Sequence, residues 1–157
     1  RNVYMPLGTT ANKQGKAAGD NMAGGSSRFA GITGTAVFKV FGLEVGRTGL
    51  TEKDAGREGV EYAAQVIEHG SRAHYCPESV KIRVKLTADK RSGLLLGAQM
   101  AGHEGVAKRI DIFAAALSGR MTVEEAANLD LGYAPPFAPV YDPVLIAAGE
   151  LLKKIKS

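Results

Sequence analysis

Alternating apolar and polar residues predict the main β-hairpin of this chain. Residues 80–88 place an apolar side chain at every second position, and residues 89–93 supply a turn before a second apolar stretch over 94–100. A period of two puts the apolar side chains on one strand face and the polar ones on the other. The polar face is basic, with Lys81, Arg83 and Lys85. A solvated face is the simpler interpretation of these cations, and an anion-binding surface is the alternative.

Further strands are predicted before this hairpin. Residues 35–41 and 43–48 alternate in the same way on either side of Gly42, which predicts a second antiparallel pair. Residues 61–69 satisfy neither the helical nor the strand period cleanly, and the β-branched pair Val66–Ile67 favours a strand. The expected sheet is antiparallel and has four or five strands.

Apolar residues spaced by three or four positions predict helices in the second half of the chain. Residues 105–120 carry one such stripe, and another begins after Asp142–Pro143. That dipeptide is typical of a helix start, because the carboxylate accepts free N–H groups and the proline has none. Short capped helices are predicted at 50–54 and 122–125. We therefore expect an α+β fold: an antiparallel four- to five-stranded sheet with helices packed mainly on one side.

The first helix is expected to lie outside this sheet. It is predicted over residues 10–23, with a Thr9–Thr10 cap and a stop at Gly24–Gly25. Its small residues recur at helical spacing, which permits close packing against a sheet or a ligand. A glycine and serine stretch follows it, so we expect residues 1–28 to belong to a neighbouring unit and residues 29–157 to form the main domain.

Four prolines occur within nine residues shortly before the last helix, at positions 135, 136, 139 and 143. Proline fixes φ and restrains the residue before it, which predicts an extended connector from Ala134 to Asp142. Tyr133 stands at its entry. A route this stiff indicates that the chain positions something there.

The composition excludes several classes of function. The 157 residues carry a net charge of only +4, which argues against a nucleic-acid partner. The single cysteine, Cys76, excludes an internal disulfide framework and a cysteine metal cluster, and this usage is typical of a cytoplasmic protein. No apolar run is long enough to cross a membrane. We expect no metal, nucleic acid or membrane partner.

Candidate chemistry is sparse. The sequence has no G-x-G-x-x-G turn, phosphate-binding loop, G-x-S-x-G elbow or metal-ligand spacing, so a self-sufficient catalytic site is not expected. Tyr75 and Tyr133 stand in unusual settings, and a phenol donates a proton or a hydrogen bond to a developing anion. The residues alone favour ordinary packing of both rings. Cys76 is a lone thiol beside a proline, and the residues alone favour a structural role for it.

Six motifs in order resemble the C-terminal part of the coenzyme A disulfide reductase and NADH oxidase branch of the pyridine nucleotide-disulfide oxidoreductases. Their residue ranges are 6–15, 34–36, 48–52, 96–99, 106–111 and 129–137. This resemblance implies that residues 29–157 form the dimerisation domain and that residues 1–28 contain the last helix of the FAD domain. The parent enzyme would be a homodimer that uses FAD and NAD(P)H. None of these cofactors is expected to bind this chain alone.

The resemblance also implies roles for individual residues. The first helix would direct its N-terminus at the flavin through Thr9, Thr10 and Ala11. Two further residues of that helix, Asn12 and Lys16, would lie near the coenzyme A channel. In coenzyme A disulfide reductases, two tyrosines of this domain reach the partner subunit's redox cysteine, and Tyr75 and Tyr133 resemble them.

The match departs from the family at one position. Related enzymes tend to carry a second tyrosine where this chain has Cys76, and Cys76 does not match the redox cysteine of the family. The isolated chain is therefore not expected to catalyse a reaction by itself. The acceptor of the parent enzyme would be coenzyme A disulfide, oxygen, a persulfide or a polysulfide. The alternative function is a stand-alone module that binds coenzyme A or another anion through Lys81, Arg83 and Lys85.

Overall fold

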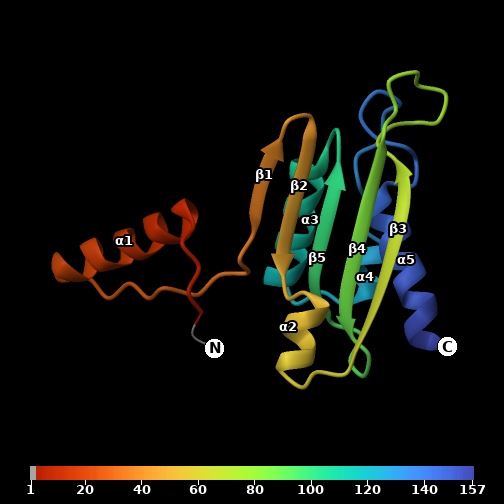
Figure 1. Cartoon of the computed structure of the whole chain (residues 1–157). Helices are drawn as coiled ribbons and strands as arrows, with labels where there is room; N and C mark the ends of the chain where they lie inside the picture. The colour runs from red at the N-terminus through yellow and green to blue at the C-terminus, as the bar shows by residue number, and fades with distance from the viewer. Residues whose placement is uncertain (1–2) are drawn as a thin grey trace.

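One antiparallel sheet organises the protein, whose structure is a computed structural model that describes residues 3–157. The sheet has five strands in the order β1-β2-β5-β4-β3 (Figure 1). The strands are β1 (Ala36–Val40), β2 (Leu43–Gly49), β3 (Tyr62–Gly70), β4 (Lys81–Asp89) and β5 (Leu95–Gly102). Both predicted hairpins are present, because β1 pairs with β2 and β4 with β5. The strand predicted over 61–69 is also confirmed, since β3 pairs with β4 from Tyr62 to Gly70.

The two hairpins join through β2 and β5 at the middle of the sheet. The chain leaves β2, passes through the short helix α2 (Glu52–Arg57) and reaches the opposite edge as β3. Thr51 caps α2 in a capping box with Asp54, as the sequence predicts. This crossing leaves residues 71–80 as a long loop between the edge strand β3 and its neighbour β4.

Helices cover one face of the sheet, which confirms the α+β prediction (Figure 1). They are α3 (Val106–Ser118), α4 (Val123–Ala127) and α5 (Pro143–Lys156). α3 packs on β2 and β5, whereas α5 packs on β3 and β4. The core between these layers contains Ile82, Val84, Leu86, Ile110, Phe113, Val144 and Leu151, all buried. Burial of each large apolar side chain contributes about 1.5–3 kcal/mol, so this layer supplies the main driving force for folding.

The first helix, α1 (Gly8–Met22), projects away from the sheet (Figure 1). The predicted threonine cap is wrong: the helix begins at Gly8, its N-cap is Leu7, and no side chain accepts a hydrogen bond from its first turn. Thr9 and Thr10 therefore lie inside the helix. Only Thr10 is buried, so the small residues of this helix do not pack on the sheet of this chain.

The predicted extended connector is wrong over part of its length. Ala134 begins a turn, in which its carbonyl accepts from the N–H groups of Phe137 and Ala138 at 2.9 and 3.0 Å. A φ near −65° suits a turn as well as an extended chain, so the prolines alone do not decide between them. The predicted start of the last helix is confirmed, because the Asp142 carboxylate accepts from the Val144 N–H at 2.9 Å. No helix within residues 3–157 is long and apolar enough to span a membrane.

Candidate functional site

Two loops meet at one end of the sheet and carry the two tyrosines singled out in the sequence. The tyrosine loop (residues 71–80) joins β3 to β4, and the proline connector (residues 131–142) leads into α5. They lie side by side, because the Ala73 N–H donates to the Pro135 carbonyl at 3.3 Å (Figure 1). The fold thus brings together segments that are about sixty residues apart in the sequence.

The hydroxyls of Tyr75 and Tyr133 lie 3.4 Å apart, within hydrogen-bond distance. Both side chains are exposed, by 62% and 47% respectively, so the pair is accessible to another molecule. The hydrogen bond with Tyr133 and partial desolvation raise the pKa of Tyr75 above its ordinary value. Tyr75 therefore remains protonated at neutral pH and is able to donate a proton or a hydrogen bond.

A cavity of about 830 Å³ opens beside the tyrosine pair. Both phenols contribute to its wall, together with Cys76 and Lys81. The volume is within the range of small-molecule sites, which is about 300–1,000 Å³. The cavity is therefore large enough to accept a small molecule beside two phenolic donors.

The basic face predicted on β4 is largely neutralised. Arg83 pairs with Glu68 at 3.3 Å, and Lys85 pairs with Glu52. Lys81 lines the cavity instead. Two of the three cations therefore have carboxylate partners within the chain, which disfavours an anion-binding surface formed by all three.

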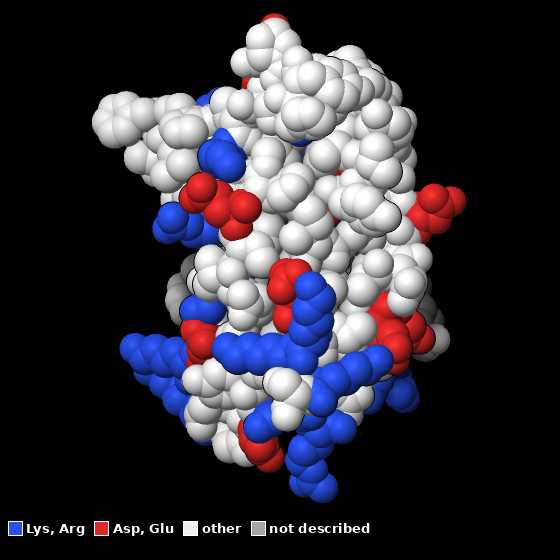
Figure 2. All heavy atoms as spheres, turned by 90° about the vertical axis from the view of Figure 1, so that its right-hand side faces the viewer, with Lys and Arg blue, Asp and Glu red and all other residues white. Residues whose placement is uncertain are grey.

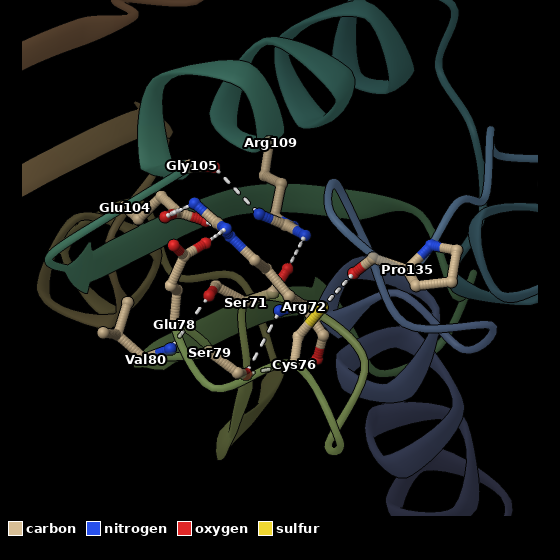
Figure 3. A network of polar contacts seen from close by, with 10 residues as sticks. All are labelled: Ser71, Arg72, Cys76, Glu78, Ser79, Val80, Glu104, Gly105, Arg109 and Pro135. Carbon is tan, nitrogen blue, oxygen red and sulfur yellow. Dashed lines mark hydrogen bonds and ion pairs between the residues drawn. The ribbon is translucent and has the colours of Figure 1, made fainter.

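A buried arginine fixes the bases of both loops, and Figure 3 shows its bonds to Ser71 and Gly105. Arg109 is 1% exposed, donates to the Ser71 carbonyl at 2.8 Å and pairs with the Asp142 carboxylate at 2.9 Å. It also donates to the Gly105 carbonyl at 3.3 Å. Sequence reasoning missed this residue. The available signal was its position on the apolar stripe of α3, between Val106 and Phe113.

A second arginine, Arg72, lies in the tyrosine loop and joins this loop to Glu104, shortly before α3 (Figure 3). Arg72 donates to Glu104 through Nε at 2.8 Å and through Nη2 at 2.5 Å, and it also pairs with Glu78. The Arg72 hydrogen bond lowers the pKa of Glu104, so this ion pair persists well below neutral pH. Together, Arg72 and Arg109 hold the tyrosine loop on α3 and on the residues before it.

The residues predicted to face a flavin lie elsewhere, on α1. Thr9 and Ala11 are exposed in its first turn, Thr10 is buried, and the Asn12 side chain donates to the Gly8 carbonyl at 3.0 Å. Lys16 is exposed one turn further along. Because no side chain caps this helix, its first N–H groups remain available to an anionic ligand edge.

The chain therefore carries two separate groups of predicted site residues. α1 projects from the β1 side of the sheet, whereas the tyrosine loop lies at the β3–β4 end (Figure 1). Within residues 3–157, no cluster of His, Cys, Asp and Glu side chains is arranged to hold a metal. In the described part of the chain, the tyrosine pair and the N-terminus of α1 are thus two separate candidate sites.

The fold and the sequence motifs together indicate the family to which this chain belongs. Residues 35–143 match the family described as the pyridine nucleotide-disulphide oxidoreductase dimerisation domain, and the chain belongs to this family. The family inferred from the six sequence motifs is thus confirmed.

Three individual proteins show which members of the family this chain is similar to. The chain is 43% identical over 148 residues to the NAD(P)H coenzyme A polysulfide/persulfide reductase of Pyrococcus horikoshii, covering 94% of this chain and 33% of that protein. It is 37% identical to an NADH oxidase of Methanocaldococcus jannaschii, covering 99% of this chain and 34% of the relative. The solved NAD-dependent persulfide reductase from A. fulgidus matches with a TM-score of 0.95 and 40% identity, over 99% of this chain and 29% of that one. The chain thus spans about a third of the length of the curated relatives it matches.

Proposed function

We propose that this chain forms the homodimer of an FAD-dependent NAD(P)H oxidoreductase and lends Tyr75 and Tyr133 to the active site of the partner subunit. The observation that carries the proposal is the exposed tyrosine pair, whose hydroxyls lie within hydrogen-bond distance on a domain of the dimerisation family. Within residues 3–157, no redox group stands beside this pair other than the thiol of Cys76. A partner that supplies the redox centre gives the two phenols a function.

An aromatic surface supports dimerisation through this end of the domain. It consists of Tyr75, Tyr133, Phe137, Val140 and Tyr141, each between 47% and 71% exposed. Figure 2 shows few charges at the upper end of the molecule, whereas Lys and Arg gather lower down. Exposed aromatic clusters with few charges are typical of protein interfaces. We name these five residues the aromatic patch and assign it to the subunit interface.

The second part of the proposal concerns α1 and the cofactor. We assign residues 1–28 to the end of an FAD domain and residues 29–157 to the dimerisation domain. The uncapped first turn of α1 fits the negatively charged edge of a reduced flavin, through the N–H groups near Thr9, Thr10 and Ala11. When bound, FAD would supply the acceptor for hydride from NAD(P)H. Asn12 and Lys16 would border the path of a coenzyme A thiol.

The chemistry assigned to the tyrosines is proton or hydrogen-bond donation. Reduction of a disulfide or persulfide releases a thiolate, and a neutral phenol stabilises that developing anion. Tyr133 is the principal donor, and Tyr75 supports it through the hydrogen bond between the hydroxyls. Among the acceptors open to this scaffold, the relatives named as persulfide reductases favour a persulfide over oxygen, and the name of the Pyrococcus horikoshii relative adds coenzyme A.

Rapid kinetics on the full-length protein that contains this chain test the proposal. Tyr133→Phe is expected to slow the reduction of coenzyme A disulfide or persulfide by at least about tenfold, since general acids contribute about 10²–10⁴ to such steps. Reduction of FAD by NADH should keep its rate. Tyr62→Phe is the matched control, because Tyr62 lies at the far end of β3 from the tyrosine loop. Equal sulfur-reduction rates in the Tyr133 variant and the parent protein would remove the donor role.

The alternative function, a stand-alone coenzyme A or anion-binding module, has weaker support. Arg83 and Lys85 already have carboxylate partners within the chain. Calorimetric titration of the 157-residue chain with coenzyme A separates the two hypotheses. A fragment of a shared site should bind weakly or not at all, whereas micromolar affinity would favour the module.

A further inference from the structure

Cys76 lines the cavity, and neither the family resemblance nor the proposed chemistry gives it a role. In this structure its Sγ donates to the Pro135 carbonyl at 3.3 Å (Figure 3). The thiol is free of any disulfide and is partly buried between the two loops. It therefore makes a direct contact between the tyrosine loop and the proline connector.

The Pro135 carbonyl accepts its hydrogen bonds from outside the proline connector. Pro135 and Pro136 have no N–H groups, and the N–H groups of Phe137 and Ala138 are both used by the Ala134 carbonyl. The Pro135 carbonyl is left pointing at the tyrosine loop. Two donors of that loop meet it, the Ala73 N–H and the Cys76 thiol, each at 3.3 Å.

The tyrosine loop holds the thiol in a fixed place. The Cys76 N–H donates to the Ala73 carbonyl at 2.9 Å, and its carbonyl accepts from the Ser79 N–H at 3.0 Å. The base of the loop is tied to Arg109 through Ser71. The backbone of Cys76 is thus fully used inside the loop, and only its side chain reaches across to the connector.

We propose that Cys76 is a positioning residue, whose thiol holds the Pro135 carbonyl and thereby keeps the two tyrosine hydroxyls paired. Tyr75 precedes the donor by one residue, and Tyr133 precedes the acceptor by two. The Cys76 contact and the phenol pair therefore join the same short segments, and loss of the first loosens the second. A thiol is a weak donor, so its effect falls on geometry more than on global stability. The kinetic consequence rests on the proposed function, whereas the geometric one does not.

The geometric test uses NMR of labelled tyrosine rings in the 157-residue chain at about pH 6, where thiols and phenols keep their protons. Because the two hydroxyls lie within hydrogen-bond distance, Tyr133→Phe should change the chemical shift of the Tyr75 Cζ. The size of this change measures how well the two hydroxyls are paired. In a Cys76→Ser background, which keeps a donor, the change should match that of the parent chain. In a Cys76→Ala background it should fall to less than half.

Circular dichroism at the same pH and urea unfolding establish that the variants stay folded. An undiminished change in the Cys76→Ala background, or a change in the Cys76→Ser background as small as in Cys76→Ala, overturns the positioning role. In the full-length protein, Cys76→Ala should slow sulfur reduction severalfold while Cys76→Ser keeps it near the parent rate. If the pairing is lost without any change in sulfur reduction, Cys76 still positions the tyrosines, and the catalytic role proposed for them fails instead.

Discussion

At the scale of single residues, Arg109 shows how a buried charge organises a functional end of the fold. A guanidinium away from water is tolerated only when its donors have acceptors. Arg109 has three acceptor groups, in the tyrosine loop, in the N-cap residue of α5 and in the N-cap residue of α3. Asp142 makes two interactions: its carboxylate neutralises the charge of Arg109 and also caps α5. Both segments that carry a tyrosine are therefore anchored to one side chain.

Replacement of Arg109 by Met should destabilise the domain by about 3–5 kcal/mol, because it leaves the carboxylate of Asp142 buried without its charge partner. Urea unfolding of the 157-residue chain measures the loss. Lys108→Met on the exposed side of α3 is the matched control and should stay within about 0.5 kcal/mol. Adding Asp142→Ser to Arg109→Met should recover part of the loss, since serine still caps the helix. Equal stability of the two single variants would show that Arg109 carries no such role.

The sequence identified both tyrosines but neither their partners nor this arginine. Tyr75 and Tyr133 stood out because prolines flank their loops and because the family motifs contain them. Their hydrogen bond depends on two loops that only the folded sheet brings together. Arg109 lay on an apolar stripe, but helical spacing alone does not tell a buried ion pair from a side chain that extends to the solvent.

At the scale of elements, most strands and helices could be predicted from neighbouring residues, whereas the pairing of strands distant in the sequence could not. Turns and caps are encoded by nearby residues, as the boxes at Thr51 and Thr122 show. The strand order depends instead on β2 meeting β5, which no local signal records. α1 had a clear pattern but the wrong expected cap, because a threonine pair does not determine at which residue a helix begins.

A close backbone contact beside the central strand β5 gives a prediction at this scale. A Cβ at Gly97 would lie 2.1 Å from the Leu50 carbonyl oxygen and 2.6 Å from its nitrogen. Gly97→Ala should therefore destabilise the domain by about 1–3 kcal/mol or more, because neither backbone can move freely. Gly149→Ala in α5 is the control: its Cβ meets nothing within 4 Å, and removal of a helical glycine should stabilise by about 0.5–1 kcal/mol. Thermal unfolding of both variants checks the opposite signs.

At the scale of the whole molecule, charge and apolar surface are divided between its two ends. The aromatic patch lies on the tyrosine loop and the proline connector, whereas α2 and the β4–β5 turn lie at the other end of the sheet (Figure 1). The exposed hairpin tip between β1 and β2 carries Phe41, which is 98% exposed, and lies towards the same end as the patch. A dimer formed through this end would cover the apolar residues and bring each tyrosine pair against the other subunit.

The last prediction concerns that dimer. Light scattering should show the 157-residue chain as a dimer at micromolar concentrations. Phe137→Glu and Tyr141→Glu each place a carboxylate in the patch and should weaken association by at least about tenfold, which corresponds to about 1.4 kcal/mol. Lys53→Glu on α2 adds a carboxylate at the far end and should leave association unchanged. A monomeric parent chain, or equal weakening by the Lys53 variant, would show that the aromatic patch is not the interface. Dissociation confined to the patch variants would place the tyrosine pair at the boundary between subunits, where the proposed chemistry requires it.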